Sequence, residues 1–460
     1  RKAPPNWKRT GYNALRTTVL YDCNRMVEQR LEASGIFSEA DTFGITLTSD
    51  GWTNIQSKPL LGFTGVTSVG SMYLGSINCE GSAKTTQYLL DRTVEIVLKV
   101  GAHKVKAFIT DNASAPRECG KALEAKYPQI FYLPCSAHCL DLLLEDIGKL
   151  TWAAKMVETG RFIVKYVRSH EWSNALVRQY ARTGSKKELL SPGDTRFGTE
   201  YLMLSRLVEK RQDLTKAVDD EAWAEHMPKQ KKVSARAQQR SSPRHKAKSG
   251  RVSKPTEKLT AAQLQAKKEK AISAKAKMEE GARRVRNLVL DDDTWEDMEF
   301  LVDLIKPMML LLRFADSNKA GLGKMYMRCS MLETWVKACN GDPAAVDAVD
   351  ELLHSMFRAT RGEQYKPTER DLFIPSITHM EVKLGVDIFD DVLGAVEARW
   401  NMLHTCAHAA AYALDPEFWA HAKTHEEGEE VLNGLYEVIN RLYTDESAQV
   451  RVRTQWSDYQ

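Results

Sequence analysis

The pattern of hydrophobic and polar positions changes its period several times between about residue 41 and residue 150. Three runs rich in β-branched and aromatic residues come first, and runs of this kind predict β-strands. A helical period follows over residues 85–100, and Gly101 suits the end of that helix. Two more strands are predicted after it, with a helix between them and another helix after the last. The expected strands are 43–48, 60–69, 71–79, 105–110 and 130–133, and the helix between the last two is 116–126.

The predicted order of elements is therefore β-β-β-α-β-α-β-α. Three successive strands followed by alternating helices and strands indicate a mixed α/β sheet covered by helices. This order is the layout of the RNase H-like fold, so we expect an RNase H-like core over residues 41–150. Residues 1–40 are expected to be a helical lead-in.

Helical patterns continue over residues 151–225 and again over 287–460, on either side of a segment of unusual composition. Residues 226–286 are rich in Lys, Arg, Ser, Ala and Gln and almost free of aromatic residues, so they cannot bury much apolar surface. We expect a basic, low-complexity insertion there, disordered or loosely helical, with a solvated helix at about 261–284. The two helical parts then form a large, mostly helical domain that interrupts the core, and the second part returns towards it.

The amino-acid composition is typical of a soluble globular protein. Its 460 residues are 43% hydrophobic and 27% charged, which fits two or three domains. No apolar run reaches the roughly 20 residues needed to cross a membrane. The 8 Cys residues are scattered without a Cys-x-x-Cys pair, which favours a reducing compartment.

The overall net charge of +4 hides an uneven distribution. Residues 229–286 contain 19 Lys and Arg but only 4 Asp and Glu, a local charge of +15, which leaves −11 for the rest of the chain. Such a segment favours phosphate contacts with DNA and nuclear localisation, and a solubilising linker is an equally weighted alternative. The candidate DNA contacts within it are Lys231, Lys232, Arg244, Lys246 and Lys248.

Asp50 and Asp111 are the candidates for metal-dependent chemistry. Each lies at the C-terminal end of a predicted strand, and in this element order the two strands can be neighbours, which would bring the carboxylates together. Carboxylate oxygens are the ligands that Mg²⁺ and Mn²⁺ prefer, and two ions about 4 Å apart can activate water for phosphodiester cleavage. The alternative is that Ser-Asp-Gly and Thr-Asp-Asn are strand-end turns, and for either aspartate alone this is the more common case.

Several short motifs resemble the eukaryotic hAT-type transposase domain and, more narrowly, a subgroup known as a domain of unknown function. The resemblance runs from about residue 41 to the region of residue 415, outside the basic segment, and its specificity comes from the order of the motifs. They are TSDGWT at 48–53, ITDNA at 109–113, CSAHCLDL at 135–142, LEDI at 144–147, TRF at 195–197, LLR at 311–313 with Asp316, and LDP at 414–416.

The resemblance implies DNA cleavage and strand transfer at an Asp-Asp-Glu site that holds two Mg²⁺ or Mn²⁺ ions. Asp50 and Asp111 match the first two acids. His138 belongs to a Cys-x-x-His motif that begins at Cys135, and it would lie near the DNA strand that is cut. Without the family, a buried cysteine and a core histidine are the simpler interpretation, because one Cys-x-x-His-Cys cannot complete a zinc site.

Arg196 and Phe197 stand where the family usually has Arg-Trp, whose ring stacks on a flipped base. Phenylalanine can also stack on a base. A core residue at the start of a helix is the alternative for Phe197.

The third acid of the family site is not identified in this chain. In the family, the Glu lies in a Ser-rich Glu-Arg motif that also supports dimerisation, and neither this motif nor the usual N-terminal zinc finger is found here. Glu397 and the glutamates at 426–430 are poor substitutes. We therefore expect a piece of a longer nuclear protein, homo-oligomeric at full length, that acts on DNA. The alternative is a domesticated or decayed copy that binds DNA or proteins without catalysis, and an RNA-cleaving RNase H enzyme ranks last.

Overall fold

The computed structural model describes residues 10–181, 187–193, 198–227, 261–317, 321–340, 342–345, 347–348, 386–418 and 428–459. The chain divides into two compact units. Unit 1 comprises Arg1–Asp146 and Pro307–Gln460, and unit 2 comprises Ile147–Lys306. The candidate DNA contacts lie outside the described residues, and these are Arg196, Phe197, Lys231, Lys232, Arg244, Lys246 and Lys248.

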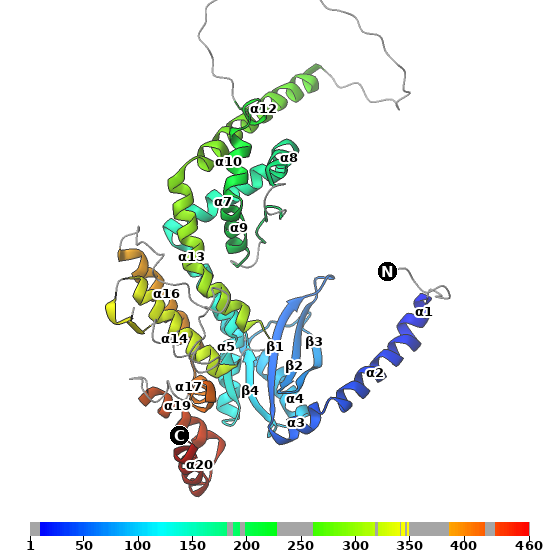
Figure 1. Cartoon of the computed structure of the whole chain (residues 1–460). Coiled ribbons are helices and arrows are strands. Elements are labelled where there is room, and N and C mark those ends of the chain that lie inside the picture. The colour runs from blue at the N-terminus through cyan, green and yellow to red at the C-terminus, as the bar shows by residue number, and fades with distance from the viewer. Residues whose placement is uncertain are drawn as a thin grey trace, which may run out of the picture. The chain divides into compact units, whose positions relative to one another are not determined.

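Unit 1 is built on a five-stranded sheet with the order β3-β2-β1-β4-β5 (Figure 1). The pairs β1–β2 and β2–β3 are antiparallel, whereas β1–β4 and β4–β5 are parallel. The predicted mixed α/β class and the predicted order of elements are confirmed. The strands are β1 (Ile45–Thr53), β2 (Pro59–Thr67), β3 (Gly70–Asn78), β4 (Val105–Thr110) and β5 (Phe131–Pro134).

Local sequence explains how the chain turns between these elements. The side-chain oxygen of Asn54 accepts hydrogen bonds from the backbone N–H groups of Gln56 and Lys58, both at 2.9 Å, and so shapes the turn between β1 and β2. Helix α4 (Thr86–Val100) is capped by Thr85, whose hydroxyl accepts the N–H of Tyr88 at 3.2 Å. The helix ends at Gly101 with a φ of 102°, as predicted.

Strand β1 is longer than the sequence predicts. It continues through Asp50 to Thr53, because β2 pairs with it as far as the Thr53–Pro59 position. Asp50 therefore lies inside the strand and not at its end. The interpretation of Ser-Asp-Gly as a strand-end turn is wrong.

Helices cover both faces of the sheet. Helices α4 and α5 (Ser114–Lys126) pack on one face, where Leu89, Val97 and Leu123 belong to the same buried cluster as Leu47 and Phe63 of the strands. The opposite face contacts helices from much later in the chain. There, Ala107, Phe131 and Leu133 form a cluster with Leu322, Cys406, Ala407 and Val438.

The remaining elements of unit 1 are helical. Residues 10–33 form a helical arm without a buried residue, which stands away from the sheet in Figure 1. This arm consists of α1 (Tyr12–Ala14), the π-helical turn η1 (Leu15–Val19) and α2 (Leu20–Ala33). The other helices are α3 (Ile36–Thr42), α14 (Leu322–Cys339), α16 (Val386–Leu403), α17 (Cys406–Leu414), the short η4 (Pro416–Phe418), α19 (Gly428–Leu442) and α20 (Glu446–Tyr459).

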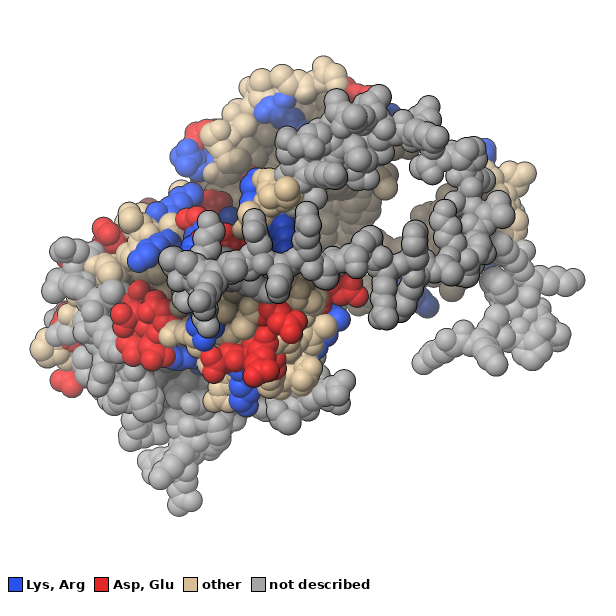
Figure 2. All heavy atoms as spheres, turned by 90° about the horizontal axis from the view of Figure 1, so that it is seen from above, with Lys and Arg blue, Asp and Glu red and all other residues tan. Residues whose placement is uncertain are grey.

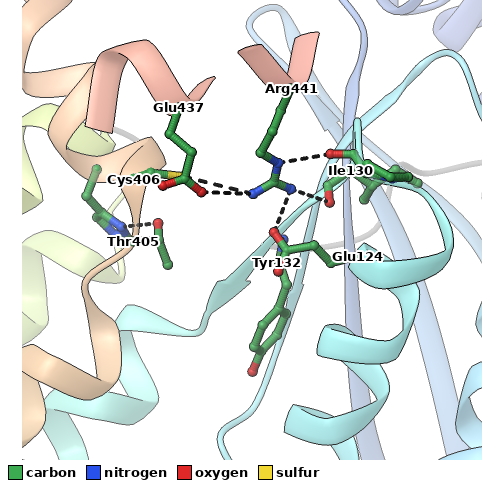
Figure 3. Close-up of polar contacts among 9 residues, drawn as sticks. Glu124, Ile130, Tyr132, Thr405, Cys406, Glu437 and Arg441 are labelled. Carbon is green, nitrogen blue, oxygen red and sulfur yellow. Dashed lines mark hydrogen bonds and ion pairs between the residues drawn. The ribbon is translucent and has the colours of Figure 1, made fainter. Parts of the chain in front are cut away.

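Arg441 of α19 joins the late helices to the sheet (Figure 3). Its guanidinium donates to a carboxylate oxygen of Glu124 in α5 at 2.6 Å and to the backbone oxygens of Pro128 and Ile130 at 3.0 and 3.3 Å. It also lies 3.9 Å from the ring centre of Phe131 in β5. A single side chain therefore contacts both a helix of one face and the edge strand of the sheet.

Unit 2 is helical around an aromatic core in which Tyr166, Trp172 and Trp223 contact one another. The end of α12 (Ala261–Val289) packs into this core, because Ala282 and Val285 are fully buried. The predicted helix at 261–284 is thus not solvated along its whole length. The other helices described within unit 2 are α7 (Thr151–Ser169), α8 (Glu171–Tyr180), α9 (Gly198–Glu209), α10 (Arg211–Asp219) and α11 (Glu221–Ala224). The boundary between the two units falls within α6 (Ser136–Lys149) and again within α13 (Asp292–Ala315).

Two general properties of the described residues bear on function. None of their helices is both long and apolar enough to span a membrane. On the face shown in Figure 2, acidic side chains gather in groups among the basic ones, in line with the negative charge of the chain outside residues 229–286.

His408 of α17 is a fully buried histidine. Its Nδ1 lies 2.9 Å from the hydroxyl of Thr405, and its ring neighbours those of Trp400 and His404. Burial, together with the nearby His404, lowers the pKa of His408 to about 3. The imidazole is therefore neutral at pH 7.

We expect replacement of Arg441 by Met to lower the free energy of unfolding by about 2 kcal/mol, since the half-buried carboxylate of Glu124 and the carbonyl of the buried Ile130 lose their bonds to a charged group. Urea unfolding measures this change. A matched control is Arg451→Met, because Arg451 is exposed and its ion pair with Asp445 is 3.9 Å long. The control should change stability by no more than about 0.5 kcal/mol, and equal effects of the two substitutions would contradict the anchoring role of Arg441.

The pKa of His408 predicts that acid destabilises unit 1. The unfolded chain binds a proton at His408 below its ordinary pKa of 6.5, and the native protein binds it only near pH 3. Stability from this residue is therefore complete above pH 6.5 and falls by up to about 1.4 kcal/mol per pH unit below it. Urea unfolding at several values between pH 7 and pH 4 should show a smaller slope for His408→Asn than for the unchanged protein, and identical slopes would disprove the assignment.

Candidate functional site

The parallel pairing of β1 with β4 determines where the two candidate aspartates lie. In its register, Thr46 is opposite Ala107 and Thr48 is opposite Ile109. Asp50 comes two residues further along β1, and Asp111 two residues further along the chain, directly after the end of β4. Both therefore reach the same end of the sheet on neighbouring strands, which lie about 4.8 Å apart. The predicted arrangement of the two strands side by side is confirmed.

Asp50 is exposed on the face of the sheet opposite α4 and α5. Leu47 and Ser49 of the same strand are buried towards those helices, and side chains alternate along a strand, so Asp50 faces the other way. Its partner in β2 is Gly62, and a side chain there would collide with the ring of Trp52, at 2.5 Å. Glycine thus lets the Trp52 ring lie next to Asp50.

Asp111 has a different environment. It is half-buried, directly follows β4, and one of its carboxylate oxygens accepts the backbone N–H of Ala113 at 3.0 Å. This local bond is the one that the turn interpretation of Thr-Asp-Asn predicts. Asp111 also lines a pocket of about 310 Å³ together with Ser49, Gly51 and Thr110, whereas Asp50 does not line it.

The Cys-x-x-His-Cys motif lies beside Asp111 at the start of α6. The backbone N–H of Cys135 donates to the carbonyl oxygen of Thr110 at 3.0 Å, which connects the beginning of α6 to the end of β4. Burial raises the pKa of the Cys135 thiol, and the carboxylates of Asp111 and Asp316 raise it further, while the backbone N–H groups of Ala137 and His138 lower it. Both carboxylates therefore lie near this thiol.

Asp316, just after α13, is an acid to which the sequence analysis gave no role. It is exposed. The only signal for it in the sequence was its place in the motif that begins at residue 311. Its carboxylate is near enough to Cys135 to raise the pKa of that thiol.

Cys139 accepts a hydrogen bond from Asn112, the residue that follows Asp111. The side-chain nitrogen of Asn112 donates to the Cys139 sulfur at 2.7 Å, and both residues are buried. Burial raises the pKa of Cys139 to about 12, so this thiol stays neutral and serves as a structural contact. The interpretation as a buried cysteine fits Cys139 well.

His138 is half-buried in the first turn of α6. Its imidazole makes no hydrogen bond or ion pair with another described residue. Its imidazole is thus available to a ligand, unlike that of a core histidine with its nitrogens bonded.

The described residues supply only part of a metal site. Asp50 and Asp111 offer hard oxygen ligands at one end of the sheet, which suits Mg²⁺ or Mn²⁺. No group of three or more His, Cys, Asp or Glu side chains within the described part of the chain could hold a metal ion.

Comparison with known families gives a match over the N-terminal third of the chain. A family described as a domain of unknown function (DUF659) matches residues 10–163, about a third of the chain. That family is associated with hAT and other transposase-like proteins. The matched residues include Asp50, Asp111 and His138, and no curated protein matches the chain.

Proposed function

We propose that the chain is part or all of an hAT-type transposase or a protein derived from one, and that unit 1 contains its RNase H-like core. The observation that carries this proposal is the β1–β4 register, which brings Asp50 and Asp111 to one end of a sheet with the order β3-β2-β1-β4-β5. The family match, which covers all five strands, supports it.

In this proposal, Asp50 and Asp111 hold Mg²⁺ or Mn²⁺, and a third acid comes from outside the described residues. Bound ions would activate a water molecule and stabilise the leaving oxygen of a phosphodiester. Only one oxygen of Asp111 accepts the N–H of Ala113, so the second remains for a metal ion. His138, with its free imidazole beside Cys135, would contact the DNA strand at the point of cleavage.

The basic segment supplies the DNA contacts in the same proposal. Its five named residues, Lys231, Lys232, Arg244, Lys246 and Lys248, would bind phosphates without reading sequence, and Arg196 and Phe197 would contact a base. The charge of +15 over residues 229–286 supports this role, because the remainder of the chain is acidic and would repel DNA. A nuclear protein that forms homo-oligomers at full length fits these contacts.

The test of the catalytic proposal is nicking of supercoiled plasmid DNA by the protein in its natural length. We expect nicking that requires Mg²⁺ or Mn²⁺ and is lost in Asp50→Asn and in Asp111→Ala. Asp91→Asn, an exposed position of α4, is the matched control and should retain activity. Nicking unaffected by Asp111→Ala would disprove the assignment. DNA binding without any nicking would favour the non-enzymatic alternative.

The test of the DNA contacts is the salt dependence of binding by the 460-residue chain. We expect the affinity for duplex DNA to fall steeply with salt. Replacing the five basic residues with Gln should reduce the slope of log K against log salt by up to about 4.5 if all five contact phosphates. The control replaces five exposed lysines of the described residues, namely Lys99, Lys106, Lys126, Lys155 and Lys165. Binding that is independent of salt would refute the role of the basic segment.

A further inference from the structure

The pocket of about 310 Å³ in unit 1 lies between the ends of β1 and β4 and the helices α4 and α5. It is on the face opposite Asp50, because Ser49, which lines it, alternates with Asp50 along β1. Its volume is at the lower end of the range of small-molecule pockets. Of its lining residues, the proposed function uses only Asp111.

The inner part of the pocket is apolar, with two hydroxyl groups that lack partners. Ser49 is 9% exposed and Thr110 is 6% exposed, and neither hydroxyl makes a hydrogen bond with another described residue. Both residues line the pocket, so both hydroxyls are free to bind a ligand there. The apolar surface around them comes from Leu61, Leu89, Phe108, Pro116 and Cys119.

The mouth of the pocket favours an anionic group. Lys84 is exposed there, and its ammonium makes only a 3.5 Å contact with the backbone oxygen of Leu60. Helix α5 begins at the mouth with Ala113 as its N-cap, and alanine has no side chain to accept the N–H groups of Ser114 and Ala115. The remaining N–H groups of a helix N-terminus, next to an exposed lysine, attract a phosphate.

Asp111 is the one carboxylate in the lining. One of its oxygens points at the backbone before α5, because it accepts the N–H of Ala113. Its negative charge offsets that of Lys84, so the pocket favours a ligand with a single, terminal phosphate over one with several.

We propose that this pocket binds one nucleotide with a terminal phosphate monoester. The base would lie against the apolar surface with its polar edge at Ser49 and Thr110, and the phosphate would lie at Lys84 and the N-terminus of α5. A free mononucleotide and the 5′-phosphorylated end of a DNA strand present the same chemistry. The proposal goes beyond the proposed function, since it needs neither metal ions nor cleavage.

Isothermal titration calorimetry of the 460-residue chain with thymidine 5′-monophosphate tests the proposal. We expect binding of one equivalent, and binding weaker by about tenfold or more for thymidine and for inorganic phosphate, each of which has only half of the contacts. Lys84→Ala and Thr110→Val should each weaken binding of the monophosphate by about tenfold. Lys99→Ala, at an exposed position of α4, is the matched control. Equal affinities of the control and Lys84→Ala, or of thymidine and its monophosphate, would overturn the proposal.

A second arm distinguishes the two sources of the phosphate. Short oligothymidylates with a 5′-phosphate or a 5′-hydroxyl are compared in the unchanged protein and in Lys84→Ala. A DNA end as the ligand predicts a preference for the 5′-phosphate that Lys84→Ala removes, and a free nucleotide predicts equal binding of both oligonucleotides together with binding of the monophosphate. Because the two oligonucleotides have the same backbone, contacts with the basic segment cancel in this comparison. These binding measurements use no Mg²⁺ or Mn²⁺ and leave Asp111 unchanged, so their failure can be told apart from failure of the catalytic proposal.

Discussion

The parallel pairing of β1 with β4 is the constraint on which the functional part of unit 1 depends. Parallel neighbours cannot be joined by a tight turn, and here the connection contains two further strands and α4. The register directs Leu47 and Ser49 to α4 and α5, and Thr48 and Asp50 to the other side. A slip by one residue would exchange the two faces. The same pairing thus sets the position of the aspartates and the lining of the pocket behind them.

The two aspartates that look alike in the sequence have different chemical surroundings. Asp50 is exposed beside Trp52, whereas Asp111 is half-buried and bonded to Ala113 at the start of α5. A metal ion bound from the side of Asp50 and a ligand in the pocket would therefore approach Asp111 from opposite faces. Occupancy of one site would alter the surroundings of the other through this one carboxylate.

Most of the sheet could be predicted from the sequence, because its strands and α4 carry local signals such as the cap Thr85 and the stop Gly101. The end of β1 could not, since residues 50–53 are exposed and become a strand only by pairing with β2. At the end of α12, arginines are interspersed among Ala282, Val285 and Val289, and the burial of these three depends on packing against residues such as Tyr166, whose ring contacts Gly281. For the site, turn propensity predicted the local bond of Asp111. The pocket at the free hydroxyls of Ser49 and Thr110 could not be predicted, because it forms only when α5 packs beside them.

The Arg441 contacts also have a consequence for how the protein is made. Arg441 binds the oxygen of Pro128, 313 residues earlier in the chain. At synthesis rates of about 5–20 residues per second, the ribosome needs roughly 15–60 seconds to produce the intervening length. During that interval the sheet face with Ala107, Phe131 and Leu133 lacks its contacts with α17 and α19, and for most of it also that with Leu322 at the start of α14. A nascent chain therefore exposes this apolar face to chaperones, and to other nascent chains, until α17 and α19 emerge.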